Sequence, residues 1–188
     1  MPARFDTDEL IQSCVEAAAE HDALLATRDV LARLLADDRA VAGALRPATG
    51  GLELLHNTDD LTVLHAIWPA GMTLLPHDHR MWAAIAVYQG REDNTFFRRA
   101  PEDSRRLVDS GARSLDVGDV QLLGDDAVHS VHNPRGTLTA AIHVYGGDFV
   151  RQPRSQWGPG ERVEQPFDLE FVLQEFAEAD ARARSEHS

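Results

Sequence analysis

The segment Gly71–Gly90 reads GMTLLPHDHRMWAAIAVYQG and contains a His-Asp-His triplet at residues 77–79. In an extended strand, side chains two residues apart point to the same face. His77 and His79 therefore aim two imidazoles at one point, while Asp78 points to the opposite face. Two convergent imidazoles form a chelating pair for a transition-metal ion. The segment thus predicts a strand that carries two metal ligands.

The region from residue 52 to about 150 consists of short β-type runs separated by turn signals, such as Pro69-Ala70-Gly71 and Pro134-Arg135-Gly136. Many short strands at this spacing indicate a β-sandwich or barrel. The helix-length intervals that a parallel sheet requires between its strands are missing. The expected strands are Leu52–His56, Leu61–Trp68, Trp82–Tyr88, Thr95–Arg99, Ser114–Val117, Val120–Leu123, His129–Val131 and Leu138–Tyr145.

Both ends of the chain have helical periodicity in their apolar residues. In the N-terminal part, Asp6 is expected to cap a first helix and Thr27 a second. Residues 146–165 are rich in Gly, Pro and Gln and are expected to form a loop, after which Pro166 opens a last helix. The simplest organisation is one domain over residues 1–188, made of a helical segment 1–46, a barrel 52–150 and a C-terminal helix 166–184.

Composition and charge restrict the class of partner. The chain has 188 residues, with 18 basic and 31 acidic side chains and a formal net charge of −13. This charge opposes nucleic acid and anionic lipid surfaces, so neither is an expected partner. The sequence has no apolar run of about 18 residues and no signal-peptide layout. Its one cysteine, Cys14, excludes an internal disulfide framework, and we expect a cytoplasmic protein.

The spacing Gly-x5-His-x-His-x10-Gly over residues 71–90 resembles the first signature of the cupin family. The segment 118–133 resembles the second signature and places His129 at the position of a third ligand. The resemblance implies a mostly β fold, the double-stranded β-helix or jelly-roll barrel. It also implies a metal ion inside the barrel mouth, held by His77, His79 and His129.

The usual cupin adds a glutamate ligand three or four residues after the second histidine, where this chain has Ala83 and Ala84. The expected site is therefore three neutral imidazoles without a carboxylate. Such a site leaves the charge of the metal to attract anionic ligands, and leaves about three open positions on a six-coordinate ion. A neutral three-histidine cupin site resembles the thiol dioxygenases, the cysteine dioxygenase family.

A second likeness to the thiol dioxygenases lies in a later strand. That family carries Ser-x-His-x-Tyr there, and the matching segment here is Ala141-Ile142-His143-Val144-Tyr145. The resemblance implies Fe(2+) as the cofactor and Tyr145 as a catalytic hydroxyl donor beside the metal. It gives His143 the task of holding Tyr145 or a water in position.

Fewer sequence features indicate the substrate pocket than indicate the metal ligands. The family anchors a substrate carboxylate with an arginine on an early strand, but no arginine lies between Arg46 and Arg80 here. Free cysteine is therefore not an assured substrate. The side chains expected to line the pocket are two that share strand parity with the ligands, Met81 and Ala83, and three polar candidates, His56, Arg91 and Arg98.

The leading interpretation is a mononuclear non-haem iron dioxygenase that oxidises the sulfur of a small thiol with O2. One alternative is another metal-dependent cupin enzyme acting on carbon, such as a diketone-type dioxygenase, an isomerase or a lyase. A further alternative is a non-catalytic cupin that binds a metal or a small molecule. Three imidazoles also suit Ni, Zn and Cu, so the metal is not fixed by the sequence. Barrels of this kind often pair through edge strands, so a homodimer is a plausible assembly.

Overall fold

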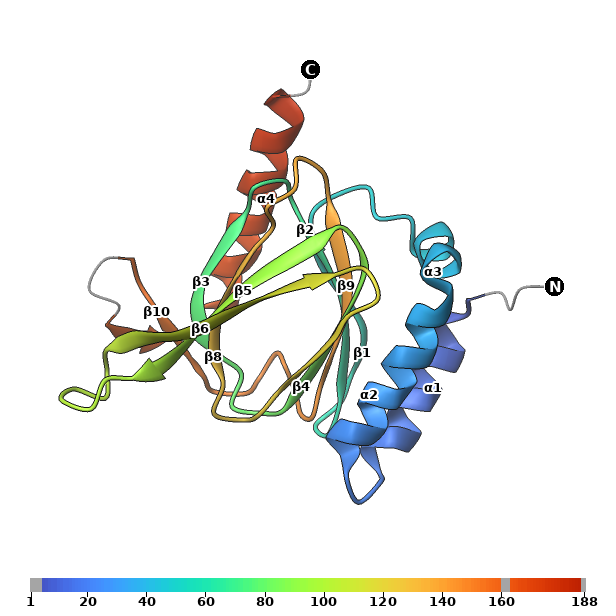
Figure 1. Ribbon diagram of the computed structural model, residues 1–188, viewed down its shortest axis with the longest axis horizontal. Helices are drawn as coiled ribbons and strands as arrows, with labels where there is room; N and C mark the ends of the chain where they lie inside the picture. Colours follow the sequence, from blue (N-terminus) through green and yellow to red (C-terminus); the bar gives the residue numbers. More distant parts are fainter. Residues whose placement is uncertain (1–4, 160–162, 187–188) are drawn as a thin grey trace.

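Two antiparallel sheets face each other in the computed structural model, which describes residues 5–159 and 163–186 (Figure 1). One sheet has the strand order β1-β2-β9-β4-β7, and the other has the order β11-β10-β3-β8-β5-β6. This arrangement confirms the predicted fold class, a mostly β double-stranded β-helix. The strands are β1 (Gly51–Asn57), β2 (Thr62–Trp68), β3 (Thr73–Asp78), β4 (Ala83–Gln89), β5 (Arg91–Arg99), β6 (Leu107–Asp116), β7 (Val120–Leu123), β8 (Val128–His132), β9 (Thr139–Tyr145), β10 (Ser155–Trp157) and β11 (Glu164–Pro166).

The N-terminal helices pack on the outer face of the five-stranded sheet (Figure 1). Asp6 caps the first helix as predicted, since its carboxylate accepts a hydrogen bond from the backbone N–H two residues on at 2.8 Å. Asp22 caps the second helix, so Thr27 is a buried residue within that helix and not its cap. The first four residues of the predicted segment 1–46 lie outside the described residues. The elements are α1 (Thr7–Ala18), α2 (Ala23–Leu34), η1 (Leu35–Asp37) and α3 (Asp38–Leu45).

The C-terminal part differs from its prediction in two places. Residues 146–165 are not all loop, because β10 and β11 pair with each other and β10 pairs with β3. The last helix, α4 (Leu169–Glu186), begins three residues after Pro166, which instead ends β11. Asp168 provides the start signal, because its carboxylate accepts a hydrogen bond from the N–H of Phe171 at 3.0 Å.

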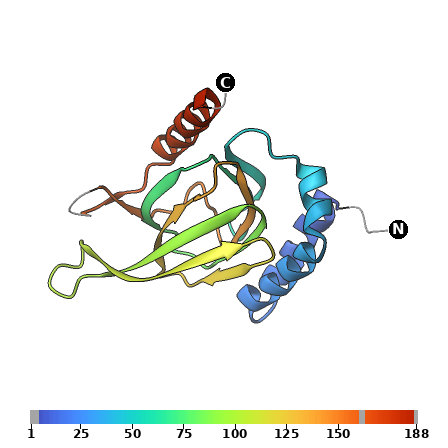
Figure 2. The same ribbon diagram turned by 45° about the horizontal axis from the view of Figure 1, so that its top comes forward.

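The interior of the barrel is closed by α4, which lies away from α1–α3 (Figure 2). Phe176 of α4 packs against Trp68 of β2 with ring centroids 5.0 Å apart, and both side chains are buried. Val172 joins the same cluster with residues from both sheets. The helix therefore forms a wall of the space between the sheets. None of the helices among the described residues is long and apolar enough to cross a membrane.

Candidate metal centre

His77, His79 and His129 come together between the sheets. His77 on β3 and His129 on β8 are direct partners in the antiparallel pairing, and His79 follows the end of β3. One ring nitrogen from each histidine lies within 4.8 Å of those of the other two. All three side chains are buried, with exposed fractions of 5, 3 and 1%. The pairing of β3 with β8 thus brings His129, which lies 50 residues after His79, to the predicted ligand pair.

Hydrogen bonds orient two of the rings toward this centre. The Nδ1 of His77 lies 2.9 Å from the carbonyl oxygen of Leu75, and the Nδ1 of His129 lies 2.7 Å from Oδ1 of Asn94. Each Nδ1–H donates to its oxygen, so each Nε2 keeps a free lone pair. Burial lowers the pKa of His77 to about 4, and it lowers the pKa values of His79 and His129 well below the ordinary range. The three rings are therefore neutral at pH 7, the form that binds metal.

The spacing of the ring nitrogens fits a shared divalent ion. Nε2 of His79 lies 3.1 Å from Nε2 of His129, and Nδ1 of His79 is buried without a hydrogen-bond partner in the described part of the chain. Two imidazole nitrogens bound at right angles to one ion, each at about 2.1 Å, lie about 3.0 Å apart. A cation between them replaces the contact of two lone pairs with two coordinate bonds. The donor set contains no carboxylate.

Tyr145 and His143 lie beside the three histidines. Strand β9 directs both side chains to the interior, where the Tyr145 ring is 4.8 Å from the ring of His79. The Tyr145 hydroxyl is 3.0 Å from Nδ1 of His143. Burial raises the pKa of Tyr145 above its ordinary value, although nearby Arg154 opposes this effect. Tyr145 is therefore a phenol, not a phenolate, at pH 7.

Sequence reasoning missed Glu92 as a member of this site. Its side chain is completely buried, and its Oε1 accepts a hydrogen bond from Trp68 Nε1 at 2.7 Å and lies 3.3 Å from Nε2 of His143. The predicted strand begins at Thr95, which leaves Glu92 outside it, whereas β5 begins at Arg91. With the longer strand, period-two alternation would have directed Glu92 and Asn94 inward.

Arg154 is a second residue that the sequence did not indicate. Its guanidinium carbon lies 4.2 Å from the ring centroid of Phe149 and 3.8 Å from that of Phe167. Nη1 donates to the backbone oxygen of Phe149, but Nε and Nη2 are buried without partners among the described residues. Burial lowers the pKa of Arg154 to about 10, so it remains a cation at pH 7. Its positive charge partly opposes the increase that burial causes in the pKa of Tyr145, and it adds to the decrease in the pKa of His77.

A small cavity adjoins the three histidines and Tyr145, whereas Glu92 and Arg154 are not among its lining residues. The three histidines, His143 and Tyr145 line one part of it, and apolar side chains including Phe149, Phe167 and Phe176 line the rest. Its free volume is about 20 Å³. A water molecule requires roughly 10–15 Å³ on this measure, so the closed cavity has room for about one. A larger ligand therefore needs part of the apolar wall to move.

The five residues predicted to line the pocket do not line this cavity. Met81 and Ala83 are buried in the cluster that contains Tyr145, but behind the cavity wall. Arg91 binds Asp93 and Ser114 at the surface. The bulge between Phe96 and Phe97 interrupts strand parity, and Arg98 beyond it is exposed. His56 follows a similar irregularity in β1 and lies near the end of that strand.

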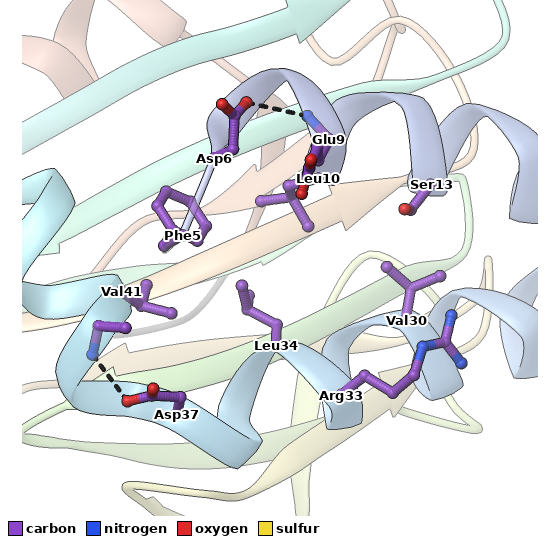
Figure 3. A pocket seen from close by; sticks show the side chains of 11 residues that line it. Phe5, Asp6, Glu9, Leu10, Ser13, Val30, Arg33, Leu34, Asp37 and Val41 are labelled. Carbon is purple, nitrogen blue, oxygen red and sulfur yellow. Dashed lines mark hydrogen bonds between the residues drawn. The ribbon is translucent and has the colours of Figure 1, made fainter. Parts of the chain in front are cut away.

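A separate hollow lies among α1, α2 and α3, on the far side of the five-stranded sheet (Figure 3). Its volume is about 240 Å³, and its apolar lining includes Leu10, Val30 and Leu34. The carboxylates of Asp6 and Asp37 at its rim accept hydrogen bonds from backbone N–H groups as helix caps (Figure 3). The hollow is therefore part of the helical packing and does not adjoin the histidines.

No family model matches the chain. Solved structures with a similar fold include an RmlC-like cupin family protein from Methanocaldococcus jannaschii, at 15% identity and a TM-score of 0.46 over 56% of this chain and 88% of that one. A cupin superfamily protein from Desulfitobacterium hafniense aligns at 14% identity and a TM-score of 0.45 over 56% of this chain and 86% of its own. A Cupin 2 conserved barrel domain protein from Salinispora arenicola aligns at 17% identity and a TM-score of 0.40 over 50% of this chain and 72% of its own.

These likenesses concern the fold and carry no information on activity. The protein is a mostly β double-stranded β-helix whose buried His77, His79 and His129 can hold a divalent metal ion.

Proposed function

We propose that this protein is a metal-dependent dioxygenase that oxidises the sulfur of a small thiol. The overall reaction is R–SH + O2 → R–SO2H, in which both oxygen atoms end on sulfur and the hydrogen remains in the sulfinic acid. The observation that carries the proposal is a donor set of three neutral imidazoles beside a buried tyrosine hydroxyl. A set without a carboxylate leaves the ion its full charge toward an anionic sulfur ligand.

In this proposal His77, His79 and His129 hold the ion. When bound, a redox-active divalent metal such as Fe(2+) supplies the Lewis acidity and electron transfer that thiol oxidation requires. The apolar wall excludes water from the reacting sulfur, and Tyr145 is the protic group beside the centre. His143 holds the hydroxyl of Tyr145 in one direction.

The buried Arg154 suggests that the substrate thiol also carries an acidic group. Two nitrogens of its buried guanidinium have no hydrogen-bond acceptor among the described residues. Each buried donor without an acceptor destabilises the folded protein by about 1–3 kcal/mol. A carboxylate on the ligand would supply the missing acceptors and pair with the positive charge. Arg154 therefore takes the place of the early-strand arginine that this chain lacks.

The direct test is metal analysis of protein purified without oxygen, followed by oxygen uptake with a panel of small thiols. We expect metal-dependent uptake with some of these thiols and formation of a sulfinic acid, detected by mass spectrometry as the addition of two oxygen atoms. A metal-loaded protein that consumes no oxygen with any thiol, but cleaves a diketone, would contradict the proposal in favour of carbon chemistry.

A further inference from the structure

Four buried polar side chains form a continuous hydrogen-bonded series: Trp68, His143 and Tyr145 line the cavity, and Glu92 does not. Trp68 Nε1 is 2.7 Å from Oε1 of Glu92, the same oxygen is 3.3 Å from Nε2 of His143, and Nδ1 of His143 is 3.0 Å from the hydroxyl of Tyr145. The exposed fractions of the four residues are 3, 0, 3 and 2%. These contacts give the four side chains a defined order of donors and acceptors, while Oε2 of Glu92 is buried without a partner among the described residues.

The roles of donor and acceptor can be assigned starting from Trp68, because its indole can only donate. An indole N–H only donates, so Oε1 of Glu92 is an acceptor. A carboxylate has no hydrogen to donate, so we assign the hydrogen between Glu92 and His143 to Nε2 of the imidazole. In a neutral imidazole that carries its hydrogen on Nε2, Nδ1 is the acceptor, and the hydroxyl of Tyr145 must donate to it.

We propose that Glu92 is a positioning residue, which sets the direction of the Tyr145 hydroxyl through His143. The hydroxyl hydrogen points to His143, so the phenolic oxygen presents its lone pairs to the cavity. Tyr145 then accepts a hydrogen bond from the ligand, which reverses the role of donor that the sequence suggested. The cavity therefore selects a ligand with a hydrogen-bond donor, such as an ammonium or hydroxyl group, near its sulfur. Only this statement about the ligand rests on the proposed function.

The chain offers a matched control on the opposite face of the same sheet. Glu53 Oε2 lies 3.2 Å from Nδ1 of His65, and Nε2 of His65 lies 2.6 Å from the hydroxyl of Tyr88. This second Glu-His-Tyr series has the same residue types, but Tyr88 packs with the cluster beneath the N-terminal helices. Glu53 is 65% exposed and Glu92 is fully buried, so Glu53→Gln makes the same chemical change beside a histidine–tyrosine pair outside the cavity.

The first experiment uses the full chain labelled with 15N at histidine, with and without one equivalent of Zn(2+), and NMR to identify which ring nitrogen of His143 carries hydrogen. We expect a single Nε2–H form in the unchanged protein, in Glu53→Gln and in Glu92→Gln, whose amide oxygen still accepts from both neighbours. Glu92→Leu should lose this single form. An Nδ1–H form in the unchanged protein, or an unaltered Nε2–H form in Glu92→Leu, would overturn the proposal.

A second measurement keeps the inference testable if Glu92→Leu does not fold. Binding to the zinc-loaded protein is compared for two thiols of equal size, one with an ammonium or hydroxyl donor and one with a methyl group in its place. We expect about tenfold tighter binding of the donor-bearing thiol, the effect of one hydrogen bond of about 1.4 kcal/mol. Equal binding would contradict the role of Tyr145 as acceptor, whereas failure to bind Zn(2+) would contradict the metal site instead.

Discussion

Replacing Arg154 with methionine tests whether its buried guanidinium binds an acidic group of the ligand. Methionine keeps a long apolar side chain between Phe149 and Phe167 but removes the charge and the two unpartnered nitrogens. A hydrogen bond to a charged group contributes about 1.5–3 kcal/mol, and each 1.4 kcal/mol or so is a factor of ten. We therefore predict that kcat/KM for a thiol with a carboxylate falls by about 10- to 150-fold.

The assay measures oxygen uptake with two thiols of similar length, one with a carboxylate and one without. Arg154→Met should lower kcat/KM for the thiol with the carboxylate and leave kcat/KM for the other thiol nearly unchanged. Arg151→Met is the matched control, because Arg151 lies three residues away with its side chain 78% exposed. Urea titration of each variant separates a loss of binding from a loss of stability. An equal decrease for both thiols, or no decrease for the acidic one, would refute the role of Arg154.

Three further predictions concern the active hydroxyl, an ion pair and a turn. Tyr145→Phe should lower turnover but leave the metal content unchanged, as measured by assay and metal analysis. The hydrogen bond from Arg99 lowers the pKa of Glu164 to about 2, so ionised Glu164 stabilises the fold above its unfolded pKa of about 4.5 and loses this effect as the pH falls toward 2. The difference in free energy of unfolding between the unchanged protein and Glu164→Gln should therefore shrink by about 1–2 kcal/mol over that range, allowing for solvent screening. Gly90→Ala should lower the free energy of unfolding by about 2 kcal/mol or more, because φ is +78° and a Cβ would lie 2.2 Å from Oγ1 of Thr139.

Each of these predictions has a contradicting result. Unchanged turnover in Tyr145→Phe would remove the hydroxyl from the chemistry. Parallel stability curves for Glu164→Gln and the unchanged protein between pH 6 and pH 2 would contradict the ion-pair effect. For the turn, Gly43→Ala in α3 is the control, since its added Cβ meets no atom within 4 Å. Equal effects of the two glycine substitutions would contradict the steric argument.

Two of the three candidate metal ligands could be predicted from local geometry. Strand alternation alone directs His77 and His79 to one point, and the same rule places His143 and Tyr145 on one face of β9. The third ligand, His129, required the family resemblance, because pairing between β3 and β8 is a contact between residues far apart in the chain. The strand at residues 73–78 was implied by the histidine pair, whereas β10 and β11 had no sequence signal of comparable strength.

Alternation depends on where a strand begins, and the predicted strand began four residues late, at Thr95, which left Glu92 outside the site. Arg98 was a candidate because of its charge, and its side chain, which follows the bulge after Phe96, is exposed. Arg154 could not be predicted, because its position depends on how the segment after β9 returns to the barrel. That return places it between two phenylalanines from different parts of the chain.

The measurement that tests the metal site most directly is a titration of the metal-free protein with Zn(2+) or Fe(2+), followed by calorimetry and metal analysis. We predict one tightly bound ion per chain, lost in His77→Ala and in His129→Ala. His132→Ala is the control, because His132 lies on the same strand as His129 but contacts Thr73 near the surface. Full binding by His77→Ala, or equal loss in His132→Ala, would contradict a three-histidine metal centre.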